Sequence, residues 1–214
     1  MKINDVAEHF VQLGSLNSEL AVTPKKIQKL LYYTQAWHLA IYDEPLFDEV
    51  VFEAWQHGPV CYDVYKQYRG FGYSPILSIV ANPRIEEAKR RFIEAVWKVY
   101  GKFTGDQLEK LTHEEELWLN ARGDLDPEEK CNEPISNEIM KATYKNMLQQ
   151  YTHIKRGNIV ELKTEEIKPN LEELLQCNKK STASSLLQLT RQWQGDDFDE
   201  CLRAVYENRG EIKL

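Results

Sequence analysis

The chain has 214 residues, 42% of them hydrophobic, which suffices for one sizeable core or for one domain with an appended segment. Its formal net charge of −7 disfavours nucleic acid as a partner, because phosphate-binding surfaces are built from clustered lysine and arginine. Charges interrupt the first twenty residues, and no run approaches the roughly 20 apolar residues of a membrane-spanning helix. We therefore expect a soluble, cytoplasmic protein that does not enter the membrane.

Two helices are predicted near the start of the chain. Asn4 can cap a helix over residues 5–14, and Thr23 followed by Pro24 predicts the clearest helix of the chain, which extends to about residue 42. The best candidate for a local basic patch lies at the start of this second helix, although a solvated helix face explains the same residues equally well: Lys25, Lys26 and Lys29.

The segment 46–60 has a different character. Strand-forming residues at 50–52, followed by Gly58 and Pro59, predict an extended stretch or a short β-strand. A short helix is then expected over residues 63–69, ahead of two glycines.

Further helices are predicted in the second half of the chain. Asn82 followed by Pro83 predicts a helix that ends near residue 100, and Ser136 precedes a strong apolar stripe that continues to about Tyr151. Between these helices lie two patterns typical of a capping box, which predict consecutive short helices at 104–111 and 113–121. The pairs are Thr104 with Gln107 and Thr112 with Glu115.

The predicted fold is therefore mainly α, with a single helical domain over residues 1–157 and a short extended or β segment near 46–60. Residues 158–214 form a C-terminal extension of predicted short helices. Because about 57 residues rarely build a core of their own, we expect this extension to pack on the domain or on another molecule.

Acidic residues are concentrated between Asp106 and Glu138, where eleven aspartates and glutamates face three basic residues, a local balance of −8. Such a segment is either a solvated face that aids solubility or a landing site for a basic partner.

Catalysis and metal binding have only weak support in the sequence. The four cysteines are scattered without a Cys-x-x-Cys pair, which is typical of free buried thiols. Cys61 with His38, His57 and His113 could in principle form a zinc site or a cysteine hydrolase, but only His57 and Cys61 are close in sequence. The alternative is that these histidines hold irregular backbone in place. Phosphate-binding glycine loops, nucleophile elbows and His-Glu-x-x-His pairs are also absent. We expect no catalytic residue, metal or cofactor, and a Cys/His hydrolase or a metal-dependent enzyme is the alternative function.

Two blocks of the sequence resemble a known family. The first block comprises Lys29–Ala40 (KLLYYTQAWHLA), Glu44–Asp48, Phe52–Val60 (FEAWQHGPV) and Asp63–Tyr65, and the second is Leu108–Arg122 (LEKLTHEEELWLNAR). Together they resemble the Panacea domain of phage-associated and antitoxin proteins, over about residues 5–155. Asp43, where the family often has glycine, and Cys61–Tyr62, where Val-Pro is common, depart from the pattern.

The resemblance implies a mainly helical, non-enzymatic antitoxin of a toxin–antitoxin system that neutralises its toxin by direct binding. It implies as partner the cognate toxin from an adjacent gene, with delivery of the toxin to a host protease as the alternative. It also implies that added segments such as 158–214 select the partner.

The residues singled out on this basis fall into two groups. The family-motif residues, expected in the core or at an interface, are Tyr33, Trp37, His38, Trp55, His57, Gly58, Pro59, Tyr65, His113, Trp118 and Arg122. The candidate partner-binding residues are Glu114, Glu115, Glu116, Trp193, Phe198, Leu202 and Tyr206.

Overall fold

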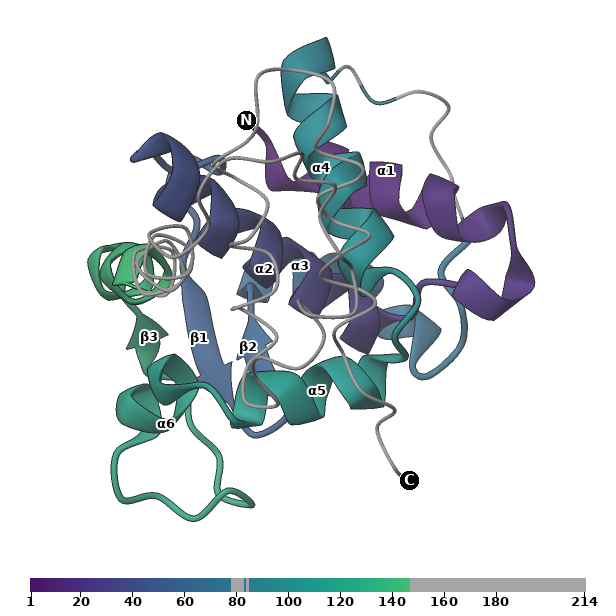
Figure 1. Cartoon of the computed structure of the whole chain (residues 1–214). Coiled ribbons are helices and arrows are strands. Elements are labelled where there is room, and N and C mark those ends of the chain that lie inside the picture. The colour runs from purple at the N-terminus through teal and green to yellow at the C-terminus, as the bar shows by residue number, and fades with distance from the viewer. Residues whose placement is uncertain (78–82, 84, 147–214) are drawn as a thin grey trace, which may run out of the picture. The chain divides into compact units, whose positions relative to one another are not determined.

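The computed structural model describes residues 1–77, 83 and 85–146 (Figure 1). Residues Met1–Thr143 form one compact unit, which contains both blocks of the family resemblance. The predicted domain end at 157 and the helices of the extension 158–214 lie outside the described residues and stay predictions.

The first two helices are α1 (Ile3–Ser15) and α2 (Pro24–Tyr42), with a 3₁₀ turn at Ser18–Leu20 between them. The expectation that Asn4 caps α1 is wrong, because Asn4 lies inside the helix and Lys2 precedes it without a side-chain cap. For α2 the prediction is confirmed: the Thr23 hydroxyl accepts a hydrogen bond from the Lys26 amide at 3.3 Å, and Pro24 occupies the first position.

Helix α2 ends at a left-handed residue, Asp43, whose φ is +66°. Glycine adopts this conformation without strain, and aspartate is among the few other residues that tolerate it. Lys141 supports the turn, because its Nζ donates to the Asp43 carbonyl at 2.9 Å and forms an ion pair with the Asp43 carboxylate. The turn therefore forms with aspartate at position 43, where the resemblance led us to expect glycine.

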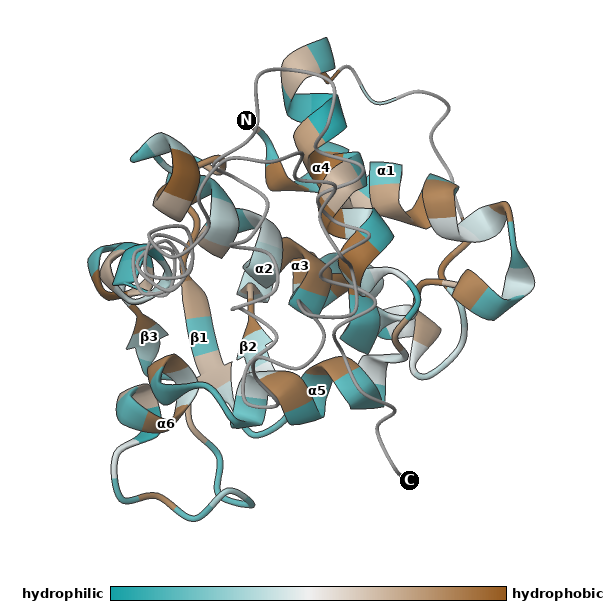
Figure 2. Ribbon diagram, in the orientation of Figure 1, coloured by the Kyte–Doolittle hydropathy of each residue, from teal (hydrophilic) through white to brown (hydrophobic). Residues whose placement is uncertain are grey.

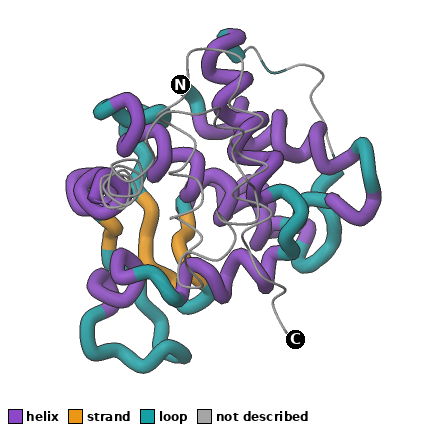
Figure 3. Tube along the Cα trace, viewed as in Figure 1, coloured by secondary structure: helices purple, strands orange, loops and turns teal. Residues whose placement is uncertain are grey.

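The extended segment forms a small antiparallel sheet with strand order β2-β1-β3 (Figure 3). Strands β1 (Phe52–Trp55) and β2 (Gly58–Val60) make a hairpin, in which Trp55 pairs with Gly58, and β3 (Pro134–Ile135) pairs with the other edge of β1. The predicted extended stretch or short strand near 46–60 is confirmed: β1 starts at Phe52, and Val51 just before it is exposed.

Helix α3 (Tyr62–Tyr68) follows the hairpin directly and continues into a 3₁₀ turn at Arg69–Phe71, as the predicted short helix required. Helix α4 (Glu87–Tyr100) begins later than the expected cap at Asn82 and Pro83. Pro83 is not helical, and residue 82 lies outside the described residues. Ile85 is buried just before the helix, and we attribute the later helix start to its packing, which outweighs the local pattern of Asn82 and Pro83.

Helices α5 (Gly105–His113) and α6 (Glu116–Arg122) follow, and residues 137–146 are also helical. Thr104 and Gln107 form both hydrogen bonds of the predicted capping box. The second predicted box is wrong, because Thr112 lies inside α5 and its hydroxyl donates to the Glu109 carbonyl at 2.8 Å.

Helix α2 contacts α1, α3, α4, α5 and β2 and is the centre of the unit. Fifteen of its 19 residues are buried, including polar ones, so it lacks a solvated face. The other helices alternate hydrophobic and hydrophilic positions around their axes (Figure 2). In the described part of the chain, no helix is long and apolar enough to cross a membrane. The mainly helical class with a short β segment is confirmed.

Candidate functional site

The two blocks of the sequence meet at the end of strand β1. The Arg122 guanidinium donates to the Ala54 carbonyl at 3.1 Å, and the Trp118 indole nitrogen donates to the Trp55 carbonyl at 2.9 Å. The His113 ring is hydrogen-bonded to the backbone of the next residue, Gln56. Three side chains of the second block therefore recognise three consecutive backbone groups of the first. We call this arrangement the hairpin support.

Arg122 extends the hairpin support to the loop after α6. Its second terminal nitrogen donates to three carbonyl groups of this loop, while its guanidinium lies 4.7 Å from the centre of the Trp118 ring. The acceptors are the carbonyls of Asp126 (2.7 Å), Pro127 (3.3 Å) and Glu129 (2.7 Å). Trp118 also stacks on His113, with ring centres 4.0 Å apart. The loop is thereby fixed to the hairpin.

The turn of the hairpin approaches α2 and α5 so closely that only glycine fits at its centre. Gly58 has a φ of +85°, and a Cβ atom there would lie 2.5 Å from Thr112 Oγ1 and 2.8 Å from Lys29 Cε. Lys29 is fully buried, and its Nζ donates to the Pro59 carbonyl at 3.0 Å. Burial lowers the pKa of Lys29 to about 7, against the attraction of Glu109.

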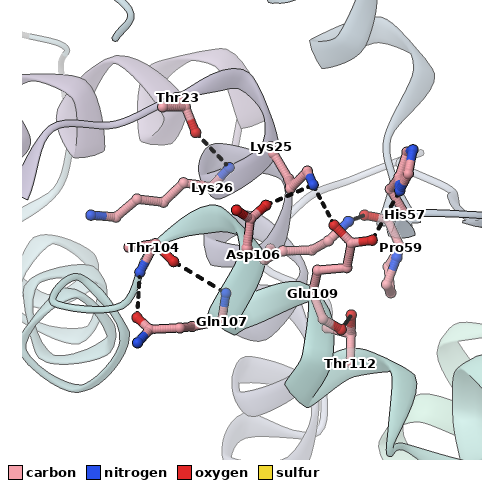
Figure 4. A network of polar contacts seen from close by, with 11 residues as sticks. Thr23, Lys25, Lys26, His57, Pro59, Thr104, Asp106, Gln107, Glu109 and Thr112 are labelled. Atoms are coloured by element: carbon pink, nitrogen blue, oxygen red, sulfur yellow. Dashed lines mark hydrogen bonds and ion pairs between the residues drawn. The ribbon is translucent and has the colours of Figure 1, made fainter. Parts of the chain in front are cut away.

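A charged network lies beside this turn (Figure 4). The Glu109 carboxylate contacts Lys25 Nζ at 2.5 Å and His57 Nδ1 at 2.9 Å, and Lys25 also contacts Asp106 at 2.8 Å. Burial by itself would raise the pKa of Glu109, but the hydrogen bonds from Lys25 and His57 hold it below the ordinary value. Because the His57 side chain is 61% exposed, the network lies at the surface, between the buried turn and solvent.

Other polar groups of α2 hold irregular backbone in the same manner. Gln28 exchanges two hydrogen bonds with the backbone of Cys61, at 2.9 and 3.2 Å. The Gln35 carbonyl oxygen accepts from the amides of Leu46 and Phe47. His38 Nδ1 lies 2.8 Å from the Glu44 carbonyl oxygen. The polar stretch of the first block thus fixes the path of the chain from residue 44 to residue 61.

The comparison with known families concerns the region that contains most of these residues. Residues 27–119 match the family model described as antitoxin SocA-like, Panacea domain. The predicted family is confirmed over this range, which is shorter than the expected 5–155 and ends just before Arg122. Neither the curated proteins nor the solved structures include a significant match to the chain.

The remaining family-motif residues divide between core and surface. Tyr33 is buried and stacks on Tyr100 with ring centres 4.1 Å apart, and the Trp37 indole donates to the Tyr100 hydroxyl at 3.0 Å. Trp55 and Tyr65 are half-buried, and their ring centres lie 5.0 Å apart.

The three glutamates of the acidic segment are not equivalent. Glu114 and Glu116 are exposed, whereas the half-buried Glu115 accepts a hydrogen bond from the Tyr32 hydroxyl at 2.7 Å. The other predicted partner-binding residues lie outside the described residues: Trp193, Phe198, Leu202 and Tyr206.

The sequence also suggested a thiol or metal site and a basic patch. Cys61 is a free, buried thiol, and burial raises its pKa, which disfavours the nucleophilic thiolate. Within residues 1–77, 83 and 85–146, no three His, Cys, Asp or Glu residues are grouped as metal ligands.

The candidate basic patch is not a solvated face either. Lys29 is buried at the hairpin and Lys25 is paired with two carboxylates. Lys26 is also buried, and its Nζ donates to the Leu20 carbonyl at 2.9 Å. All three lysines therefore bind groups of their own chain.

Sequence reasoning missed the roles of Lys29, Gln28 and Glu109. One signal was available for Lys29, because it lies four and eight residues before Tyr33 and Trp37 and so falls on the predicted buried face. A lysine at such a position requires a buried acceptor, which here is a hairpin carbonyl. No local pattern marks Glu109, since its partners are 52 and 84 residues away.

Proposed function

We propose that the chain is the antitoxin of a toxin–antitoxin pair and neutralises its cognate toxin by direct protein–protein binding. The observation that carries the proposal is the match of residues 27–119 to the antitoxin-like Panacea model. The chemistry of the hairpin support agrees with it, because His113, Trp118 and Arg122 bind backbone of their own chain. Neutralisation by occlusion needs a shaped surface with a few anchors, and no bond has to be broken.

The acidic segment supports a basic partner. Residues 123–130 are all exposed. Carbonyl groups of this loop accept hydrogen bonds from Arg122, so the side chains of the loop are what it offers to a partner. A basic toxin would associate faster with such a surface through electrostatic steering.

The extension 158–214 is proposed as the segment that selects the partner, through apolar residues such as Trp193, Phe198, Leu202 and Tyr206. This part of the proposal rests on the resemblance and on the expectation that a segment of about 57 residues packs on another surface. We further propose that the complex forms in the cytoplasm.

Co-expression with the product of the adjacent gene tests the proposal. We expect the full chain to restore growth of cells that produce this toxin and to co-purify with it as a stable complex. A chain that ends at Gly157, checked for folding by circular dichroism, should lose both if the extension selects the partner. Absence of both rescue and complex with the full chain would remove the proposal.

The same experiment in a strain that lacks the host protease separates the alternative. Neutralisation by binding should persist there, whereas rescue that disappears would indicate an adaptor that delivers the toxin to the protease.

A further inference from the structure

A cluster of aromatic side chains lies on the surface where the hairpin meets α3. Trp55 contacts Tyr65 at 5.0 Å and Tyr62 at 6.4 Å between ring centres, and Tyr62 and Tyr65 stack at 6.3 Å. We call Trp55, Tyr62 and Tyr65 the aromatic face. Tyr62 is 49% exposed and the other two are half-buried, so the face is open to solvent rather than part of the core.

Hydrogen bonds to neighbouring groups fix the position of Trp55 and of the start of α3 in the aromatic face. The Trp55 indole nitrogen donates to the Glu53 carboxylate at 2.6 Å, and the Trp55 carbonyl accepts from Trp118. Tyr62 begins α3 directly after Cys61, whose backbone is bound by Gln28. A preorganised aromatic surface loses little conformational entropy on binding, which is a property of interaction hot spots.

One cation of the chain already occupies this face. Lys66 Nζ lies 4.9 Å from the centre of the Tyr62 ring and forms a 2.9 Å ion pair with Asp63. Both charged side chains are solvated, with exposed fractions of 50% for Lys66 and 77% for Asp63, so the pair is weak and easily exchanged. The position of Lys66 indicates which kind of group the face can bind: a cation that lies above an aromatic ring and next to a carboxylate.

We propose that the aromatic face, flanked by Glu53 and Asp63, binds a lysine- or arginine-bearing segment of the toxin, which displaces Lys66. The inference rests on the proposed antitoxin function and names the surface and the partner chemistry for it. Charge complementarity favours this occupant, because the chain carries a net charge of −7 and both flanking residues are acidic. Arginine in particular stacks on aromatic rings while it pairs with carboxylates.

Binding of the purified full chain to the product of the adjacent gene, measured by calorimetry, tests this surface. Tyr62→Ala should weaken the complex at least about tenfold, since exposed aromatic anchors carry a large share of binding energy. Lys66→Ala should tighten it by roughly two- to fivefold, because the competing cation is removed. Tyr73→Ala is the matched control: Tyr73 is 91% exposed and lies outside the cluster, so its loss should leave affinity unchanged.

The outcomes separate this inference from the proposed function. A wild-type complex that Tyr62→Ala leaves intact would overturn the aromatic face as the docking surface. Weakening by Lys66→Ala would overturn displacement, since Lys66 itself would then be the contact. A complex that requires Tyr62 but tolerates glutamine at every lysine and arginine of the toxin would overturn the basic partner. If the wild-type chain forms no complex at all, the proposed function fails, and this surface fails with it.

Discussion

On the side of the hairpin that meets α5 and α6, aromatic and basic side chains end in hydrogen bonds to backbone carbonyls. On the side that meets α3, Trp55, Tyr62 and Tyr65 contact one another and the exposed Lys66. Trp118 and Trp55 illustrate the difference: the first is 2% exposed and donates to the hairpin backbone, whereas the second is half-buried and donates to the half-buried carboxylate of Glu53.

If the aromatic face binds the toxin as proposed, residues of the same chemical type serve stability on one side of the hairpin and recognition on the other. The hairpin support satisfies backbone groups that would be costly to bury alone, so changes there should first affect folding. In the aromatic face, Tyr62 is 49% exposed, so a change there should affect binding and leave folding intact. A variant of the hairpin support that binds the toxin poorly but is as stable as the wild type would contradict this division.

The largest effect is expected at Gly58. Gly58→Ala combines a positive φ with a Cβ atom that would lie 2.5 Å from Thr112 Oγ1, so the hairpin must move away from α2 and α5. We expect a loss of about 3 kcal/mol or more in the free energy of unfolding, measured by urea denaturation. Gly72→Ala is the matched control, since Gly72 also has a positive φ, +56°, but a Cβ atom there would meet nothing within 4 Å; it should cost only the backbone strain, about 1–2 kcal/mol. Equal costs at the two positions would refute the steric explanation.

Arg122 should follow. Arg122→Met removes the donor to four carbonyls, those of residues 54, 126, 127 and 129, and should destabilise the fold by about 2–4 kcal/mol. The loop 123–130 should also become sensitive to limited proteolysis. Arg91→Met, on the exposed side of α4, should change stability by less than about 0.5 kcal/mol when both variants are measured by urea denaturation. A resistant loop in the Arg122 variant would show that other contacts hold it.

The buried amine of Lys29, which binds the Pro59 carbonyl, makes the stability of the fold depend on pH. Its pKa is about 7 in the folded chain and 10.5 in the unfolded one, so above pH 7 the unfolded state binds the extra proton and stability rises with pH. Lys26 shifts in the same direction, so the difference between wild type and Lys29→Met is the quantity to measure. This difference should change in favour of wild type by about 1–2 kcal/mol between pH 7 and 8.5. A constant difference would mean that Lys29 keeps its proton when buried.

Local sequence signals predicted those elements whose determinants are close in sequence. The Thr23 hydroxyl accepts a hydrogen bond from the Lys26 amide, and Pro24 begins that helix. Thr104 and Gln107 bond each other, so both caps act within three residues and both helices start there. Thr112 carried the same pattern but turned its hydroxyl back to the Glu109 carbonyl, because the packing of α5 against the hairpin keeps residue 112 helical. The pattern could not distinguish a cap from an internal threonine.

The rest depends on long-range contacts. Strand β3 has two residues and no pattern of its own; it exists because Ile135 pairs with Phe52. The family blocks predicted the residues of the hairpin support, but not that three of them bind consecutive backbone groups. The aromatic crowding around Trp55 was visible in the sequence, whereas the place of Lys66 above Tyr62 required the helical turn of α3.

The smallest effect concerns the acidic segment, and it sharpens the division between stability and recognition. Glu114→Lys with Glu116→Lys reverses two exposed charges, while Glu115 is left unchanged because it binds the Tyr32 hydroxyl. If the toxin is steered by charge, association should slow by roughly three- to tenfold at low salt, and the difference should vanish at about 1 M salt, where the Debye length is about 3 Å. Glu86→Lys with Glu87→Lys, at the start of α4, makes the same net change at another exposed helix terminus and is the matched control. Stopped-flow association measures both pairs: equal slowing would assign the effect to net charge alone, and no slowing in either would leave affinity to anchors such as Tyr62.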